Sequence, residues 1–227
     1  MKRSAVNQAI AWAKDYLQKN NIHLPEYAYW PLETWKANVD KLDTVRKVML
    51  GWDITDYGLD DFEHIGAVLY TVRNGSINDK SVGVPFAEKY IILRSGQRLT
   101  NHYHVAKTED IINRAGGTLQ LYLWNVDPAT GKVLDTDVNV YMDGVLHTFK
   151  PGAEVLVEPG NSISLTPYIA HIFGAKPGSD LVVGEVSSIN DDNTDNYFSE
   201  PVKRFADIEE DEPIYHPLCG EYEALLL

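Results

Sequence analysis

From Gly66 to Ser188 the chain is a series of short β-branched and aromatic runs, each ended by Gly, Pro, Asn or Asp. Runs of this length, broken so often by turn residues, are typical of an antiparallel sandwich or barrel. Asn74-Gly75 and Asp143-Gly144 suit tight hairpin turns. The runs are GAVLYTVR, FAEKYIIL, TLQLYLWNV, VNVYMDG, AEVLVEPG, SISLTP and DLVVGEVSS. The sequence therefore predicts a mainly β fold.

Two amphipathic segments precede these runs. Residues 4–20 carry apolar side chains at three- and four-residue spacing, which predicts a helix that packs on the core, with Ser4 as its cap. Those apolar positions are Val6, Ile10, Ala13 and Leu17. A second helix is predicted in PLETWKANVDKL, because Pro31 suits a first helical turn.

A histidine-rich string lies between two of the predicted strands. Gly96 is followed after five residues by His102-Tyr103-His104, after four more by Glu109, and after six more by Gly116. Residues i and i+2 of a strand face the same side, so His102 and His104 can bind one ion, with Glu109 returning on the next turn or strand. Two imidazoles and a carboxylate suit Mn, Fe, Co, Ni or Zn better than Ca or Mg.

A fourth ligand is expected at His171, which follows an apolar strand and a turn in NSISLTPYIAHIFG. His147, in VLHTFK, is the competitor, although its position indicates a partly exposed strand histidine. An alternating histidine pair alone is more often just part of a polar strand face. The glycines and the glutamate in this order favour the metal site.

The histidine string resembles the first motif of the cupin superfamily at every defining position. The resemblance implies a cupin-type double-stranded β-helix (jelly-roll) barrel with N-terminal helices and a metal near its centre. Gly160, Pro167 and His171 match the second motif. Tyr168 stands where a glycine is common, and the usual asparagine three residues beyond His171 is absent.

A length of 227 residues is enough for one substantial core. We expect a single cupin domain over residues 1–227, in which a helical extension (residues 1–60) packs on a barrel core (residues 66–190). The net charge of −13 disfavours nucleic acid and membrane partners. With no signal peptide in the sequence and one cysteine, Cys219, we expect a cytoplasmic protein. The acidic tract IEEDEP (residues 208–213) is expected to be a solvated surface.

Across most of its length the chain also resembles the D-lyxose isomerases. The stretches that carry this resemblance are MKRSA, LGWDIT, FAEK, HYHVAKTEDIINR, GTLQLYLWN and GEVSSINDDNTDNYF. It implies a metal-dependent intramolecular oxidoreductase that interconverts D-lyxose and D-xylulose, and D-mannose and D-fructose. Mn²⁺ is the expected cofactor, while Co²⁺, Fe²⁺, Ni²⁺ and Zn²⁺ also suit the ligands. One metal site favours proton transfer through a cis-enediol. By resemblance we also expect a homodimer.

Ionisable side chains near the predicted metal supply the acid and base. A lysine beside a divalent cation is expected to have a lowered pKa. Glu185 lies in an apolar strand, where it is either a paired structural carboxylate or the base. The predicted catalytic residues are Lys107, Glu185 and Glu109, and the predicted substrate-binding residues are Lys89, Asp195 and Arg204.

Two other functions fit the same barrel. An iron cupin dioxygenase uses similar ligands, but the insertion of oxygen into an apolar substrate has no need of Lys89, Lys107 and an acidic loop. A non-catalytic sugar-binding or structural cupin needs no exchangeable acid and base beside the metal. A phosphosugar isomerase is disfavoured, because the sequence has no compact basic cluster for a phosphate.

Overall fold

The computed structural model describes residues 1–192 and 194–226. Its helices are α1 (Arg3–Lys19), α2 (Leu32–Ala37), α3 (Asp43–Lys47) and α4 (Tyr222–Leu226), with 3₁₀ turns η1 (Glu26–Tyr29), η2 (Val39–Lys41) and η3 (Cys219–Glu221). Its strands are β1 (Gly51–Thr55), β2 (Ala67–Gly75), β3 (Gly83–Leu93), β4 (His102–Tyr103), β5 (Glu109–Gly116), β6 (Leu119–Asn125), β7 (Val138–Met142), β8 (Val145–Phe149), β9 (Glu154–Val157), β10 (Ser162–Leu165), β11 (Ile169–Ala175), β12 (Leu181–Ser188) and β13 (Tyr197–Phe198).

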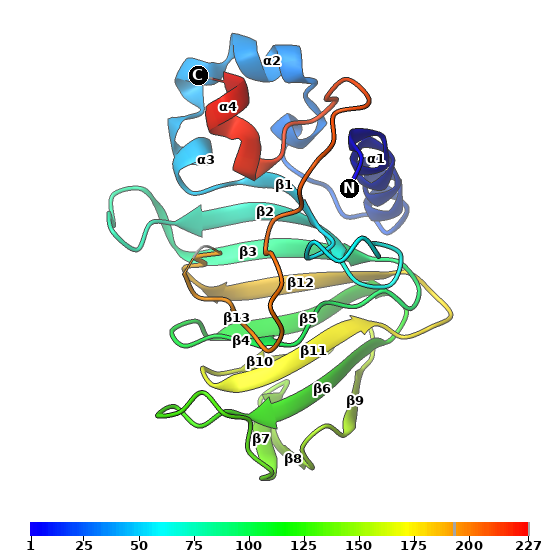
Figure 1. Ribbon diagram of the computed structural model, residues 1–227, viewed down its shortest axis with the longest axis vertical. Helices are drawn as coiled ribbons and strands as arrows, with labels where there is room; N and C mark the ends of the chain where they lie inside the picture. The colour runs from blue at the N-terminus through cyan, green and yellow to red at the C-terminus, as the bar shows by residue number, and fades with distance from the viewer. Residues whose placement is uncertain (193, 227) are drawn as a thin grey trace.

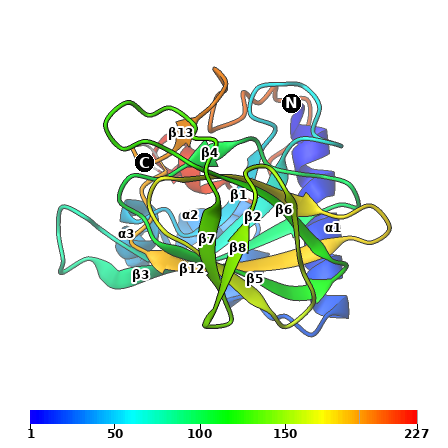
Figure 2. The same ribbon diagram turned by 90° about the horizontal axis from the view of Figure 1, so that it is seen from below.

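The strands form two antiparallel sheets (Figure 1). The large sheet has the order β1-β2-β3-β12-β5-β10-β7-β8, and the small sheet has the order β13-β4-β11-β6-β9. Seen from below, the β7–β8 hairpin crosses the lower end of the molecule (Figure 2). Each of the seven predicted runs forms a strand, so the expected mainly β, cupin-type barrel with N-terminal helices is confirmed.

The main core fills the space between the two sheets. On β2, Leu69 points into this core, whereas Val68 and Tyr70 point outward beneath α1. Strands in this part of the large sheet are therefore buried on both faces, since their side chains alternate between two apolar layers. The predicted face of α1 is buried against the outer layer, through Val6, Ile10, Ala13 and Leu17. The second predicted helix is α2, and it ends at Ala37.

The start of α1 differs from the prediction. The helix begins at Arg3, and the side chain of its N-cap residue, Lys2, makes no capping hydrogen bond. The backbone N–H and the hydroxyl of Ser4 instead donate to the carboxylate of Asp211, at 2.8 and 2.7 Å. The acidic tract (residues 208–213) thus contacts the first turn of α1 and is not simply a solvated surface, because carboxylates stabilise the positive end of a helix. No helix in the described residues is long and apolar enough to cross a membrane.

One predicted hairpin turn is confirmed and the other is wrong. Asp143 and Gly144, both with positive φ, form the two-residue loop between β7 and β8. Asn74-Gly75 is not a turn, because Gly75 still pairs with Gly83 and the loop follows it. The buried amide of Asn74 donates to the carbonyl oxygens of Val48 and Asn190 instead.

Candidate metal centre and sugar site

Three charged side chains continue the inward-facing rows of the large sheet. Lys89, Glu109 and Glu185 each lie two residues from a fully buried isoleucine or valine of the main core, on β3, β5 and β12. The two-residue period of a strand therefore points all three into the barrel. Glu185 lies directly opposite Lys89 in the β3–β12 register. All three side chains are buried.

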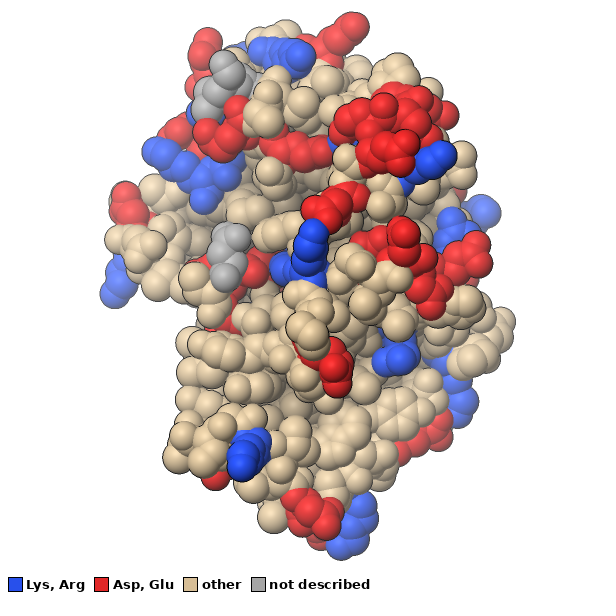
Figure 3. Space-filling view, in the orientation of Figure 1, with Lys and Arg blue, Asp and Glu red and all other residues tan. Residues whose placement is uncertain are grey.

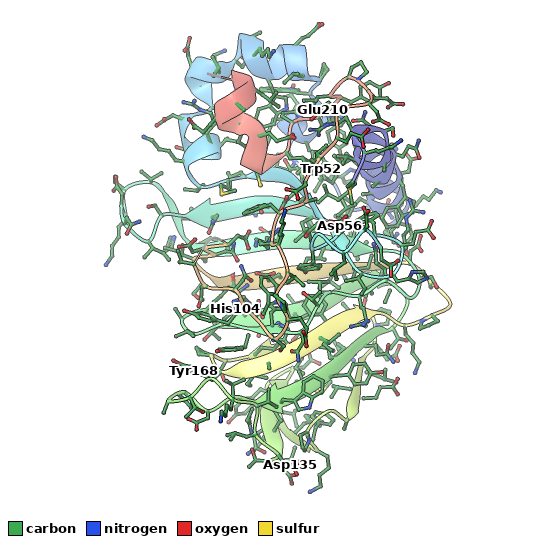
Figure 4. All side chains as sticks on the ribbon, in the orientation of Figure 1. Trp52, Asp56, His104, Asp135, Tyr168 and Glu210 are labelled. Atoms are coloured by element: carbon green, nitrogen blue, oxygen red, sulfur yellow. The ribbon has the colours of Figure 1, made fainter. Side chains whose placement is uncertain are left out.

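Three histidines face these charges from the small sheet. His102 lies on β4 and His104 just after it, and His171 on β11 is the register partner of His102. The Nδ1 atom of each ring lies at hydrogen-bonding distance from a backbone carbonyl oxygen, of Thr100, Asp195 and Ile169 respectively. A carbonyl only accepts, so each Nδ1 carries the proton and each Nε2 keeps a free lone pair. Figure 4 shows His104 in the middle of the molecule.

The free lone pairs of these rings converge with a carboxylate. The candidate ligand nitrogens of the three histidines lie within 4.8 Å of one another. Oε1 of Glu109 lies 3.6 Å from Nε2 of His104 and 3.3 Å from Nε2 of His171. These three atoms are buried and have no hydrogen-bond partner among the described residues. Ligands about 2.1 Å from a metal lie roughly 3.0–3.4 Å apart, so the donor set fits a divalent transition metal.

Burial keeps the histidine rings uncharged. It lowers the pKa of His104 to about 4, with a further contribution from the ammonium of Lys107. Burial likewise lowers the pKa values of His102 and His171. Because these pKa values lie below the usual 6.5, protons begin to compete for the nitrogens only in more acidic solution than for an exposed histidine.

We therefore expect metal affinity to change little between pH 7.5 and pH 6. Titration of the metal-free protein with Mn²⁺ at several pH values measures this. Histidines of ordinary pKa would bind protons in this range, and the affinity would then fall steeply below about pH 6.5. Such a fall would contradict the lowered pKa values.

Lys107 lies in a buried ion triplet beside the histidines. Its Nζ is 2.7 Å from Oε2 of Glu109 and 2.9 Å from Oε1 of Glu185. Burial alone would lower the pKa of Lys107, but the two carboxylates outweigh it and raise this pKa. The two carboxylates thus act on this pKa in the direction opposite to that expected from a neighbouring divalent cation. Burial acts against the charge of Glu109 as well, yet Lys107 holds the pKa of this carboxyl well below its usual range.

A second buried charge network lies beside the ion triplet, and both networks line one cavity inside the barrel. Nζ of Lys89 lies 3.2 Å from the carboxylate of Asp192. Nη2 of Arg204 lies 3.0 Å from Asp192 and 2.9 Å from the carboxylate of Asp53. Nη1 of Arg204 is buried without a hydrogen-bond partner among the described residues. The cavity is lined by side chains of both networks and by His102, so the sequence-predicted Lys89, Lys107, Glu109, Glu185 and Arg204 all meet there.

Asp195 lies outside this cavity lining. Its carboxylate accepts backbone N–H groups of Val105, Ala106 and Lys107, at 2.8 to 3.3 Å. Its carbonyl oxygen also accepts from Nδ1 of His104. These contacts orient the segment that carries two of the candidate ligands. The role of Asp195 in substrate binding stays a prediction.

We expect Asp195→Ala to weaken metal binding by about 10- to 100-fold, because partners that orient metal ligands typically contribute this much. Asp195→Asn retains one acceptor oxygen, so its metal affinity should fall between those of Asp195→Ala and wild type. Metal titration followed by sugar kinetics at saturating metal separates the two roles. A raised KM for sugar at unchanged metal affinity would favour direct substrate binding instead.

The structure explains why glycine is common at position 168 and why asparagine is absent at position 174. Tyr168 has φ of +64°, a left-handed conformation that glycine adopts without strain, and its N–H donates to the carbonyl of His104. Three residues beyond His171 stands Gly174, where an added Cβ would lie 2.4 Å from the carbonyl oxygen of Gln97. An asparagine therefore cannot stand there without a shift of the backbone. His147 is exposed on β8.

Asp53 and the pairing of Asp192 were missed by the sequence reasoning. Asp53 is buried in the middle of β1, within the stretch LGWDIT. A carboxylate between apolar strand residues requires a partner and is the signal that could have identified it. Asp192 was one of several similar residues in NDDNTDNYF, and nothing in that stretch distinguishes it, because its partners lie far away in the sequence.

Solved structures share this architecture. An L-ribose isomerase from Cellulomonas parahominis superposes with a TM-score of 0.59 at 15% identity, over 92% of this chain and 98% of that chain. A mutant L-ribose isomerase from Acinetobacter sp. DL28, in complex with L-ribose, superposes with a TM-score of 0.60 at 14% identity, over the same shares of the two chains. At such identities the likeness concerns the fold.

Sequence relatives are much nearer. A protein from Serratia proteamaculans named D-lyxose/D-mannose isomerase is 42% identical over 224 residues, which cover 98% of either chain. One of the same name from Escherichia coli O157:H7 is 40% identical over 228 residues, with the same coverage. The family model described as D-lyxose isomerase matches residues 1–222. With this match over nearly its whole length, the chain belongs to the D-lyxose isomerase family.

Proposed function

We propose that this protein is a metal-dependent aldose-ketose isomerase that interconverts D-lyxose with D-xylulose and D-mannose with D-fructose. The observation that carries the proposal is the buried ion triplet of Lys107, Glu109 and Glu185 beside the three-histidine cluster. A proton donor, a carboxylate base and a metal site are what the transfer of a carbonyl between adjacent carbons requires. Membership of the D-lyxose isomerase family supports the choice of sugars.

Glu185 is the proposed base for the carbon-bound proton. Its carboxylate removes the proton from C2 of the aldose, which gives a cis-enediol, and returns it to C1 of the ketose. Glu185 is buried and bonded to Lys107, so its position relative to the sugar is fixed. Proton return by one carboxylate on one face predicts partial exchange with solvent, which deuterium in the product would reveal.

Lys107 is the proposed acid for the oxygen-bound proton. Its raised pKa means that it is protonated at neutral pH, so it donates to O1 as the carbonyl becomes a hydroxyl and regains a proton from O2. Glu109 contacts both the proposed acid and the metal ligands, because one of its carboxylate oxygens faces Lys107 and the other faces the histidines.

The metal would be held by His102, His104, Glu109 and His171. A bound divalent ion supplies positive charge that stabilises negative charge developing on the substrate oxygens. Manganese is the proposed ion, although the donor types also suit Co²⁺, Fe²⁺, Ni²⁺ and Zn²⁺. We also retain a homodimer in the cytoplasm as part of the proposal.

Lys89 and Arg204 are the proposed contacts for the sugar hydroxyls away from the reacting carbons. Both line the cavity, and Nη1 of Arg204 is buried without a hydrogen-bond partner among the described residues. A cation with a free N–H in a buried cavity gains a hydrogen bond when a hydroxyl enters. Asp192 holds both cations and is placed to accept from the same hydroxyls.

Conversion of D-lyxose and D-mannose by chelator-treated protein, with and without added Mn²⁺, tests the proposal. Ketose should form only after metal is restored, and deuterium from the solvent should appear in it. If no ketose forms with any of the five metals, the isomerase proposal fails. Oxygen uptake with Fe²⁺ would then test the dioxygenase, and sugar binding without turnover would indicate a non-catalytic cupin.

A further inference from the structure

The C-terminal segment between β13 and residue 211 crosses the front of the molecule without forming a helix or strand of its own (Figure 1). We call residues 199–211 the strap. It lies between the sugar cavity and the start of α1. A hollow of about 480 Å³, lined in part by Asp53, Ile54 and Phe205, adjoins residues 205–208 of the strap. Ile208 packs on the apolar layer beneath α1, and the rest of this part of the strap depends on polar anchors for its position.

The strap carries Arg204 into the sugar site. The carbonyl oxygen of Arg204 accepts a hydrogen bond from the hydroxyl of Thr55 at 2.8 Å. The backbone N–H of the neighbouring Lys203 donates to the carbonyl oxygen of Tyr57 at 3.1 Å. The guanidinium then reaches Asp53 and Asp192 at the cavity. Arg204 is therefore the part of the strap through which a displacement would reach the substrate.

Arg3 anchors the other end of the strap. Its side chain is fully buried. Its guanidinium donates to both carboxylate oxygens of Glu210, at 2.9 and 2.7 Å, and also bonds Glu221 near the C-terminus. The backbone N–H of Arg3 donates to the carbonyl of Glu209 at 2.8 Å. Figure 4 shows Glu210 beside the start of α1.

The buried positive charge of Arg3 requires carboxylate partners at this place. Acidic side chains gather where the strap passes α1 (Figure 3), and a buried guanidinium cannot exist there without its carboxylates. The bidentate geometry with Glu210 fixes direction as well as distance. Since α1 packs its apolar face on β2, Arg3 connects the strap to a rigid part of the barrel.

We infer that Arg3 is a positioning residue for the sugar site: by holding Glu210 it fixes the strap and, through the strap, the guanidinium of Arg204. The inference rests on the proposed isomerase function. Arg3 does not touch the cavity, so it acts on the binding of sugar and not on the chemistry at C1 and C2. Five residues, 205–209, lie between Arg204 and Glu210; none of them belongs to a helix or strand, and Glu209 forms an isolated bridge with Lys2.

The test compares Arg3→Met and Glu210→Gln with wild type and with Leu17→Ala. Leu17 is buried at the far end of α1, so its truncation destabilises the helix and leaves the anchor intact. Glu210 is half-exposed, so Glu210→Gln folds even if Arg3→Met does not. The readouts are D-lyxose kinetics at saturating Mn²⁺ and hydrogen–deuterium exchange of residues 203–209, with and without D-lyxose.

For both anchor variants we expect KM to rise about tenfold with kcat changed less than about twofold, because one charge-assisted hydrogen bond to the sugar is weakened. Exchange in residues 203–209 should accelerate, and its slowing by D-lyxose should disappear. Leu17→Ala should change neither. Equal effects in Leu17→Ala, or unchanged KM and exchange in the anchor variants, overturn the inference. If wild type forms no ketose, the proposed function fails, while protection of the strap by D-lyxose still decides the role of Arg3.

Discussion

Replacement of His171 by alanine should abolish tight metal binding and lower the rate of ketose formation by about 10³-fold or more. The ring is fully buried, its Nδ1 bonds the carbonyl of Ile169, and its Nε2 faces Glu109 without a hydrogen-bond partner among the described residues. An alanine leaves His102, His104 and Glu109 as an incomplete donor set. Metal content after dialysis and kcat with D-lyxose are the two measurements.

The matched control for this variant is His147→Ala. His147 was the competing candidate for the fourth ligand, and it lies exposed on β8, in the hairpin that forms the edge of the large sheet. Its replacement should leave metal content and kcat unchanged. If both variants bind metal as wild type does, the site assembled from β4, β5 and β11 is not the metal centre. Loss of metal from His147→Ala alone would make the competing ligand the correct one.

The part of the site that the sequence predicted is the part specified by local spacing. His102 and His104 alternate along an extended segment, so the two-residue period turns both rings to the same side. Glu109 begins β5 in the other sheet and meets them because the two sheets face each other across the core. His171 required one further step, the pairing of β11 with β4, which a preceding apolar strand and turn made predictable. The run of seven strands was visible for the same reason, because each strand is marked by its own composition.

The networks that the sequence did not predict join segments far apart along the chain. Arg204 meets Asp53 across most of the length of the protein, and Arg3 meets Glu210 from opposite ends of the sequence. Composition makes an acidic tract such as residues 208–213 a solvated surface by default. Only the position of α1 in the folded protein gives it a buried partner. The Asn74-Gly75 turn failed similarly, since a tertiary partner, Asn190, outweighs the local turn preference.

The second large effect is expected from Lys107→Met, which should destabilise the metal-free protein by about 3–5 kcal/mol at neutral pH, the usual cost of breaking a buried ion network. The side chain of methionine fills a similar space but leaves Glu109 and Glu185 as neighbouring buried carboxylates without their cation. Urea unfolding measures the change. Lys150→Met is the control, because Lys150 forms an ion pair with Asp137 at an exposed site; its free energy of unfolding should not change.

The pH dependence of this difference identifies its cause. Lys107 holds the pKa of Glu109 below the ordinary 4.5, so this pair contributes stability that is present above pH 4.5 and is lost as the pH falls toward the folded-state pKa. The destabilisation by Lys107→Met should therefore be largest at pH 7 and shrink as the pH falls, first because the two neighbouring carboxylates of the variant bind protons more readily than ordinary carboxyls, and further below pH 4.5 because wild type loses its ion pair. A difference that is independent of pH would show that lost packing, and not lost charge, destabilises the variant. In the folded variant kcat should fall by about 10²-fold or more, since Lys107 is also the proposed proton donor.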